Sequence, residues 1–126
     1  MRPAEPAELL PSGQILSAAN EDYAELVNRC GPFSLSDRSF DNCLQKAAAE
    51  ADRRMTEAYR QSLSIIAPSK KEALRETQRV WLQFLKANCE FIRLIAPSDS
   101  RKQQYYDCLI RMAIERAKEL RNRIGD

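Results

Sequence analysis

The four cysteines are the residues of this sequence best suited to chemistry. Cys30, Cys43, Cys89 and Cys108 are an even number in a chain of 126 residues, which favours two disulfides in an oxidising compartment. Zinc binding is the alternative, but zinc ligands usually come in pairs that lie two to four residues apart. These cysteines are 13, 46 and 19 residues apart and the sequence contains no histidine. We therefore expect disulfides and no metal site.

Residue combinations for catalysis are scarce. Without histidine there is no Ser-His-Asp triad, no Cys-His pair and no histidine-ligated catalytic metal. The sequence also lacks a glycine-rich phosphate loop. Carboxylate pairs such as Glu50 with Asp52 or Glu72 with Glu76 are more typical of a solvated helix face than of a glycosidase. We expect a binding protein without a cofactor rather than an enzyme.

The charge balance argues against a nucleic-acid partner. The chain has 20 basic and 18 acidic residues and only 7% aromatic residues, whereas a single-stranded nucleic-acid site combines a basic groove with several aromatic side chains. The first 63 residues carry 7 basic and 10 acidic side chains, and the last 63 carry 13 and 8. This asymmetry indicates either a basic face or complementary charges between packed helices. No run approaches the roughly 20 apolar residues of a membrane span.

The elements that position these residues are helices, because apolar residues recur at steps of three and four. The pattern predicts an all-α fold with three long helices, over residues 40–66, 74–92 and 105–124. Pro68 and Pro97 end the first two. The expected core face of the second helix consists of Leu74, Thr77, Trp81, Phe84, Leu85, Asn88 and Ile92. Short connections make successive helices antiparallel neighbours, so we expect a bundle.

Both breaks between the long helices carry the same tetrapeptide, Ile-Ala-Pro-Ser, at residues 66–69 and 95–98. We interpret it as a helix-stop, helix-start device used twice rather than as an internal repeat. Each break is also followed by the spacing of a capping box. The two predicted boxes are Ser69 with Glu72 and Ser100 with Gln103.

The N-terminal region differs from the rest. Three prolines within residues 1–12 exclude a continuous helix and predict a flexible lead-in, so residues 13–126 should form a single helical domain. A helix laid against the bundle is expected between a cap at Ser12 and a stop at Gly31, although residues 20–22 offer a later start.

The helix order restricts the disulfide pairing. Cys89 lies near the end of the second long helix and Cys108 near the start of the third, so antiparallel packing brings them level. Cys30 and Cys43 flank a single loop. Of three possible connectivities, we predict Cys30 with Cys43 and Cys89 with Cys108, each worth about 3 kcal/mol in the chain-entropy model.

Several polar residues fall on or beside the expected core faces. Asp52 borders the apolar face of the first long helix, and Arg116 lies between apolar residues of the third. Because a half-buried charge without a partner is costly, we expect the two to meet each other or a tyrosine hydroxyl. Gln78 beside Trp81 should belong to the same kind of clamp between helices, and a ligand site is the alternative.

Three segments carry a resemblance to a known family. The segments are Ala48–Tyr59, Leu74–Phe84 closing on Cys89, and Cys108-Leu109 followed by Arg116 and Leu120. They resemble three motifs of the LprI-like family, which is named for a mycobacterial lipoprotein that inhibits lysozyme. The first segment resembles the motif with Ala-Asp, Leu-Asn and Tyr, and the second resembles the Gln-Arg-Ala-Trp motif with its Cys. The third resembles the ending with Cys-Leu, Arg and Leu. Met55-Thr56 and Leu85-Lys86 depart from the family pattern.

The resemblance implies an exported or periplasmic protein of the bacterial envelope from which a leader has been removed. It also implies an inhibitor, or an immunity protein, for a lysozyme-like peptidoglycan hydrolase. The alternatives are a non-catalytic envelope adaptor that binds another protein through a helix face and a cytosolic helical regulator with free thiols.

The cleft of such a hydrolase contains two carboxylates, so an inhibitor should present hydroxyl or cationic groups on a rigid loop. The first candidate is the segment at residues 97–102, which is held between Cys89 and Cys108, and the second is residues 34–38. An outward tyrosine beside the first loop would form a hot spot, because one of Tyr105 and Tyr106 should point to solvent. The predicted partner-binding residues are Ser98, Asp99, Ser100, Arg101, Lys102 and Tyr105.

Overall fold

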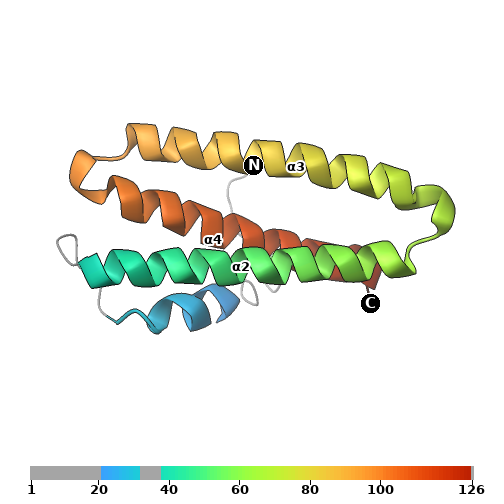
Figure 1. Cartoon of the computed structure of the whole chain (residues 1–126), viewed down its shortest axis with the longest axis horizontal. Helices are drawn as coiled ribbons and strands as arrows, with labels where there is room; N and C mark the ends of the chain where they lie inside the picture. The colour runs from blue at the N-terminus through green and yellow to red at the C-terminus, as the bar shows by residue number, and fades with distance from the viewer. Residues whose placement is uncertain (1–20, 32–37, 126) are drawn as a thin grey trace, which may run out of the picture.

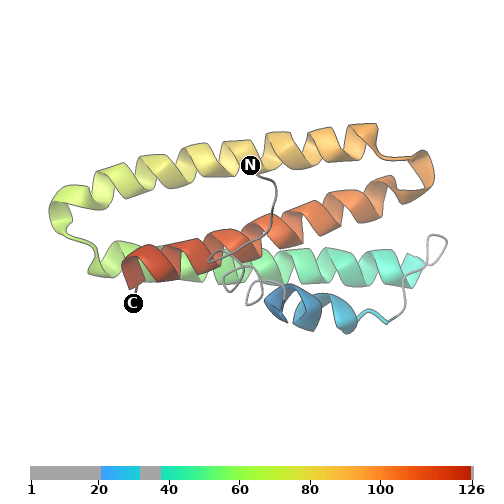
Figure 2. The ribbon, with the colours of Figure 1, turned by 180° about the vertical axis from the view of Figure 1, so that it is seen from behind.

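The computed structural model describes residues 21–31 and 38–125, and its long helices run side by side along the long axis of the molecule (Figure 1, Figure 2). The elements are α2 (Arg38–Ile65), α3 (Lys71–Ile95), α4 (Arg101–Leu120) and a π-helical turn, η4 (Arg121–Gly125). Residues 21–28 form a further helical segment beside the first half of α2. The described residues contain no strand, and the predicted all-α, antiparallel bundle is confirmed. None of their helices is both long enough and apolar enough to cross a membrane.

The main interface joins α2 to α4, and small side chains make it close. Ala51 and Ala58 on α2 and Ala113 and Ala117 on α4 are at most 2% exposed, which allows the two helix axes to approach each other. Larger buried residues fill the space around them: Leu26, Phe40, Leu44, Met55, Leu74, Ile110, Ile114 and Leu120. Burying one such side chain stabilises the fold by roughly 1.5–3 kcal/mol.

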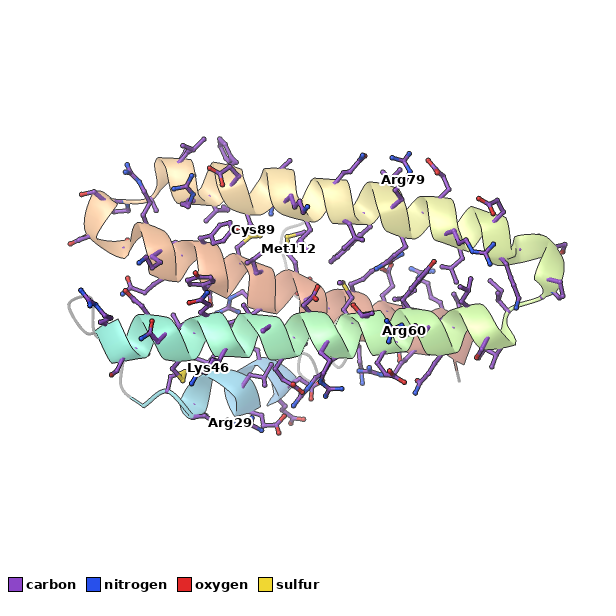
Figure 3. The ribbon with its side chains drawn as sticks, in the orientation of Figure 1. Arg29, Lys46, Arg60, Arg79, Cys89 and Met112 are labelled. Carbon is purple, nitrogen blue, oxygen red and sulfur yellow. A yellow bond between two sulfur atoms is a disulfide. The ribbon has the colours of Figure 1, made fainter. Side chains whose placement is uncertain are left out.

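Helix α3 packs mainly on α4 and has few contacts with α2. Its own cluster consists of Leu85 with the Cys89–Cys108 disulfide, against which Trp81 and Met112 pack. Figure 3 shows Cys89 and Met112 in the space between the two helices. The bundle therefore has one large core and one smaller core, and the smaller one is built around a disulfide.

The predicted disulfide pairing is confirmed. Cys30 pairs with Cys43 and Cys89 with Cys108, each with 5.5 Å between the Cα atoms. The first bridge is possible because the N-terminal helical segment ends at Gly31, whose φ of 76° is the left-handed conformation that closes a helix. The proposed lead-in at residues 1–12, the cap at Ser12 and most of residues 34–38 lie outside the described residues.

The predicted capping boxes are wrong, although both breaks lie where the prolines place them. The breaks contain short 3-10 turns, η2 (Pro68–Lys70) and η3 (Ser98–Ser100), which join directly to the following helices. Ser69 lies inside η2, and Lys70 is the N-cap of α3 without a side-chain bond. Ser100 is the N-cap of α4, but its hydroxyl donates to the carbonyl of Pro97 and does not cap the helix.

The predicted core face of α3 is wrong at two positions. Thr77 is exposed and Phe84 is 57% exposed, whereas Gln78 takes the buried position beside Leu74 and Trp81. On α4, the buried residues Ile110, Ala113, Ile114 and Ala117 belong to the large core, whereas Cys108 and Met112 of the same helix belong to the smaller one. A central helix needs two apolar faces because it packs against neighbours on two sides.

Candidate functional site

The candidate site is the connection between α3 and α4, at the end of the bundle where α2 begins (Figure 1). Ser98, Asp99, Arg101 and Lys102 are exposed there, while Ser100 is only 9% exposed. The backbone N–H of Ser100 donates to the carbonyl of Pro97 at 3.0 Å, and its hydroxyl donates to the same oxygen at 3.3 Å. The connection is thus a closed turn that presents a hydroxyl, a carboxylate and two cations to solvent.

Two anchors hold this turn against the bundle. The Cys89–Cys108 disulfide ties the last turns of α3 to α4. Gln103 supplies the second anchor, because its Nε2 donates to Oδ1 of Asp41 at 2.6 Å and so joins the start of α4 to the start of α2. This hydrogen bond joins half-buried groups from distant parts of the chain. It therefore fixes the turn relative to α2, which contacts within the turn do not do.

Tyr105 lies in a different environment from the one predicted. It packs against the Leu85, Cys89 and Cys108 cluster, and its ring meets that of Tyr106 edge to face at 5.6 Å. Both tyrosines are half-buried, so the prediction that one points freely to solvent is wrong. Each ring covers a different core cluster, and the cluster beside Tyr105 contains the Cys89–Cys108 disulfide.

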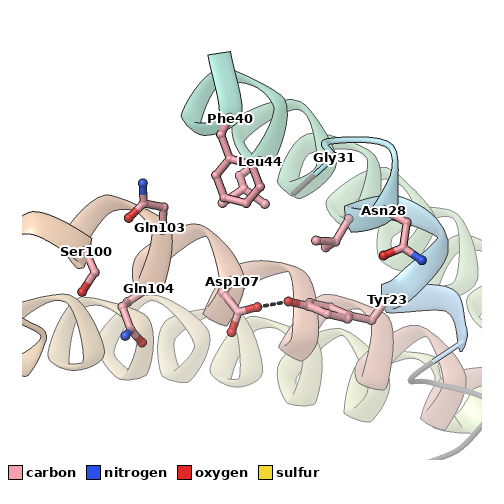
Figure 4. A pocket seen from close by; sticks show the side chains of 10 residues that line it. Tyr23, Asn28, Gly31, Phe40, Leu44, Ser100, Gln103, Gln104 and Asp107 are labelled. Atoms are coloured by element: carbon pink, nitrogen blue, oxygen red, sulfur yellow. Dashed lines mark hydrogen bonds between the residues drawn. The ribbon is translucent and has the colours of Figure 1, made fainter. Parts of the chain in front are cut away.

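A cavity of about 320 Å³ opens beside the turn, between the N-terminal helical segment, α2 and α4 (Figure 4). Phe40 and Leu44 form an apolar wall, while Gln103, Gln104 and Asp107 contribute polar groups from α4. The volume is at the lower end of the range for small-molecule pockets. It is also large enough for an inserted side chain of a protein partner.

Tyr23 and Asp107, which line this cavity, belong to a network that the sequence did not predict. The Tyr23 hydroxyl donates to Oδ1 of Asp107, and Arg111 donates to Oδ2 of the same carboxylate at 2.9 Å. The Arg111 guanidinium also lies 4.0 Å from the centre of the Tyr23 ring, a cation–π contact. Burial, reinforced by the bond to Asp107, raises the pKa of Tyr23 to about 12. Both carboxylate oxygens already have donors, so Asp107 is held as a structural acceptor.

Only a weak sequence signal pointed to this network. Asp107 and Arg111 are four residues apart, the spacing of an ion pair on one helix face. Their contact with Tyr23 spans 84 residues of sequence, and a single sequence contains no information that links the two segments. The same is true of Asp41 and Gln103, which are 62 residues apart.

The predicted clamp is correct in three of its four residues and lies near the opposite end of the bundle. Arg116 is 8% exposed, its Nε donates to Oε1 of Gln78 at 3.0 Å, and its guanidinium lies 5.5 Å from the Trp81 ring. Glu119 supplies the counter-charge at 2.7 Å. Asp52 is exposed, so its predicted contact with Arg116 is wrong. Asp52 lies on the solvent side of α2, one residue beyond the fully buried Ala51.

The clamp borders a second cavity, of about 390 Å³, with Ile66, Leu74, Leu120 and Ile124 in its walls and Lys70 and Arg123 at its charged edge. Within the described ranges, no group of three or more His, Cys, Asp or Glu side chains is placed to hold a metal ion. The polar groups that line the two cavities are hydroxyl, amide, carboxylate, ammonium and guanidinium groups.

Comparisons with known proteins give one match. No curated protein and no solved structure matches the chain. The family described as lysozyme inhibitor LprI matches residues 34–120, which is well over half of the 126 residues and includes three of the four cysteines, α2, α3 and α4. The chain therefore belongs to the lysozyme inhibitor LprI family.

Proposed function

We propose that this protein is an exported or periplasmic inhibitor, or an immunity protein, that binds a lysozyme-like peptidoglycan hydrolase. Membership of the lysozyme inhibitor LprI family supports a protein partner of this kind. The proposal assigns the contact to the turn at residues 97–102, which we name the α3–α4 turn.

The observation that carries the proposal is the combination of exposed charge and fixed backbone in the α3–α4 turn. Arg101 and Lys102 are exposed beside a turn that is closed on Pro97 and fixed by a disulfide and by the Gln103–Asp41 bond. A lysozyme-like cleft holds two carboxylates, to which cations and hydroxyl groups are complementary. A turn that is already ordered before binding loses little conformational entropy in the complex.

The cavity beside the turn extends this surface. Its polar groups from α4 and its apolar wall at Phe40 and Leu44 would accept a side chain from the rim of the hydrolase cleft. The Tyr23–Asp107–Arg111 network holds two of the residues that line the cavity, Tyr23 and Asp107, so this part of the proposed contact surface is ordered before binding.

The test is an assay of cell-wall lysis by a panel of peptidoglycan hydrolases, with and without the protein. For a hydrolase that the wild type inhibits, the Arg101→Ala/Lys102→Ala variant should weaken inhibition about tenfold or more, the equivalent of about 1.4 kcal/mol or more of binding free energy. The chain offers a matched control in the other connection, Lys70→Ala/Lys71→Ala, because these cations follow the same Ile-Ala-Pro-Ser tetrapeptide. The control should inhibit like the wild type.

Equal inhibition by the wild type and the Arg101→Ala/Lys102→Ala variant would remove the α3–α4 turn from the contact. Failure of the wild type to inhibit any hydrolase of the panel would count against inhibition itself. In that case, capture of an envelope assembly factor rather than a muramidase from envelope extract would favour the adaptor function.

A further inference from the structure

The solvent side of α3 carries a continuous row of small and apolar residues. The row, which we name the α3 stripe, consists of Ala73, Thr77, Val80, Phe84, Ala87, Phe91 and Leu94, and every member is exposed. The exposed fractions of Phe84, Phe91 and Leu94 are 57%, 56% and 61%. Soluble monomers seldom leave contiguous apolar areas of this kind open to water, and such areas usually mark an interface.

The spacing of the α3 stripe is that of a coiled-coil seam. Its members follow one another at steps of 4, 3, 4, 3, 4 and 3, which is the heptad a/d pattern for packing against a second helix. The residues that face the bundle form a separate row, which includes Leu74, Gln78, Leu85 and Cys89. At 3.6 residues per turn the two rows lie roughly a third of a turn apart, so α3 can use both at once.

We propose that the α3 stripe is the interface of a symmetric dimer, in which α3 packs antiparallel against α3 of a second copy of this chain. The observation that identifies the occupant is self-complementarity of side-chain size. When two stripes are placed antiparallel with their midpoint between Phe84 and Ala87, each larger residue meets a smaller one. Phe84 faces Ala87 of the second copy, Phe91 faces Val80, and Leu94 faces Thr77, and two-fold symmetry repeats each contact.

The charges beside the stripe are compatible with this pairing. Glu76 and Glu90 are each ion-paired with an arginine of the same helix, Arg79 and Arg93, and Figure 3 shows Arg79 pointing away from the bundle. In the antiparallel register Gln83 lies nearest Glu90 of the second copy, so the closest flanking contact is between an amide and a carboxylate. No like charges are forced together, which would otherwise disfavour self-association.

The available area is sufficient for a specific dimer. Val80, Phe84, Phe91, Leu94 and the neighbouring Ile95 are between 48% and 64% exposed, and an aromatic side chain buries roughly 150–250 Å² when fully enclosed. The apolar side chains alone then supply roughly 1,000 Å² over the two copies, and the flanking polar residues bring the total into the range of specific interfaces. The two α3–α4 turns would lie at opposite ends of the dimer, about 40 Å apart along the helix axis, and would stay open to a partner.

Sedimentation of the full chain over a range of concentrations tests the proposal. We expect a reversible monomer–dimer equilibrium in the wild type, and a monomer at all concentrations in Phe84→Glu and in Phe91→Lys, with unchanged helical circular dichroism. The matched control is Leu82→Glu, which replaces a 36% exposed apolar residue on the other side of the same helix and should still dimerise. A wild type that remains monomeric, or a dimer that survives in Phe84→Glu, would overturn the proposal.

The direction of the helices can be measured in the same protein. All four cysteines are in disulfides, so Glu72→Cys provides one free thiol for a spin label at the exposed start of α3. The antiparallel register places the two labels about 40 Å apart, at 1.5 Å per residue of helix. A distance below about 20 Å would indicate parallel helices, at the usual interaxial spacing of 8–10 Å, and would overturn the proposed register.

Discussion

The two connections between the long helices share the tetrapeptide Ile-Ala-Pro-Ser but have different structures. In the first, at residues 66–69, the helix ends before Ile66, Pro68 begins the 3-10 turn, and no residue of the turn is buried. In the second, at residues 95–98, Ile95 is still helical, Pro97 precedes the turn, and Ser100 is buried within it. The same four residues thus lie one position earlier relative to the second turn than relative to the first.

The difference comes from what each turn packs against. The second turn lies near the Cys89–Cys108 disulfide and the Gln103–Asp41 bond, which hold the start of α4 close to α3 and α2. The first turn has neither anchor, and its neighbour is the clamp of Arg116, Gln78 and Trp81 deeper in the bundle. The same tetrapeptide stops a helix in both places, but the tertiary contacts determine how rigid each turn becomes. Four predictions test this comparison.

Removing the disulfide beside the second turn should have the largest effect. We expect Cys89→Ala/Cys108→Ala to lower the free energy of unfolding by about 3 kcal/mol, because the bridge closes a 19-residue separation. Urea denaturation measures the loss. Amide hydrogen exchange should accelerate at residues 96–103 and stay unchanged at 66–71. Equal acceleration of amide exchange in both connections would contradict the claim that the disulfide holds only the second turn.

The first turn and the buried clamp border the same cavity, so we expect the second-largest effect at that end of the bundle. Gln78→Leu leaves the Nε of Arg116 without its acceptor and should cost roughly 1–3 kcal/mol. The double variant Gln78→Leu/Arg116→Met removes both polar groups and should recover part of this loss. Thermal and urea unfolding of the two variants give the difference. A double variant less stable than Gln78→Leu would contradict this account of the clamp.

The Tyr23–Asp107–Arg111 network, beside the cavity next to the second turn, should make a smaller and pH-dependent contribution to the free energy of unfolding. Tyr23→Phe removes the hydrogen bond to Asp107 and should cost roughly 1–2 kcal/mol near neutral pH. The folded pKa of Tyr23 is raised from 10.0 to about 12, so its contribution is complete below pH 10 and is lost as the pH rises through about 12. The stability difference between wild type and variant, followed by urea unfolding, should therefore shrink over that interval. A difference that stays constant would assign the effect to packing alone.

The smallest effect should come from the serines of the two turns. Ser100→Ala removes a hydroxyl that donates to Pro97 inside a buried turn and should cost about 0.5–1.5 kcal/mol. Ser69 is exposed within η2, and Ser69→Ala should change stability by less than about 0.5 kcal/mol. Equal effects in thermal unfolding would show that the two turns are held alike.

The features that followed from sequence are those with a local cause. Prolines ended the helices near Pro68 and Pro97, Gly31 ended the N-terminal segment, and the antiparallel order brought Cys89 level with Cys108. Gln78, Trp81 and Arg116 were found because a polar residue on an apolar face needs a partner. The partner of such a residue depends on which side chains lie close to it in the folded chain. The sequence does not show this, so Asp52 was wrongly predicted to contact Arg116.

Residue types and their spacing were thus enough to predict an all-helical, disulfide-linked chain with its breaks, its cysteine pairs and a charged connection between Cys89 and Cys108. Helix packing determines which apolar row of α3 faces the bundle, because Phe84 and Leu85 both continue rows with helical spacing and only one of them can face α4. It also determines that Tyr23 meets Asp107 and that Asp41 meets Gln103. These contacts depend on how whole helices lie against one another, and helical periodicity specifies the faces of a helix but not its neighbours.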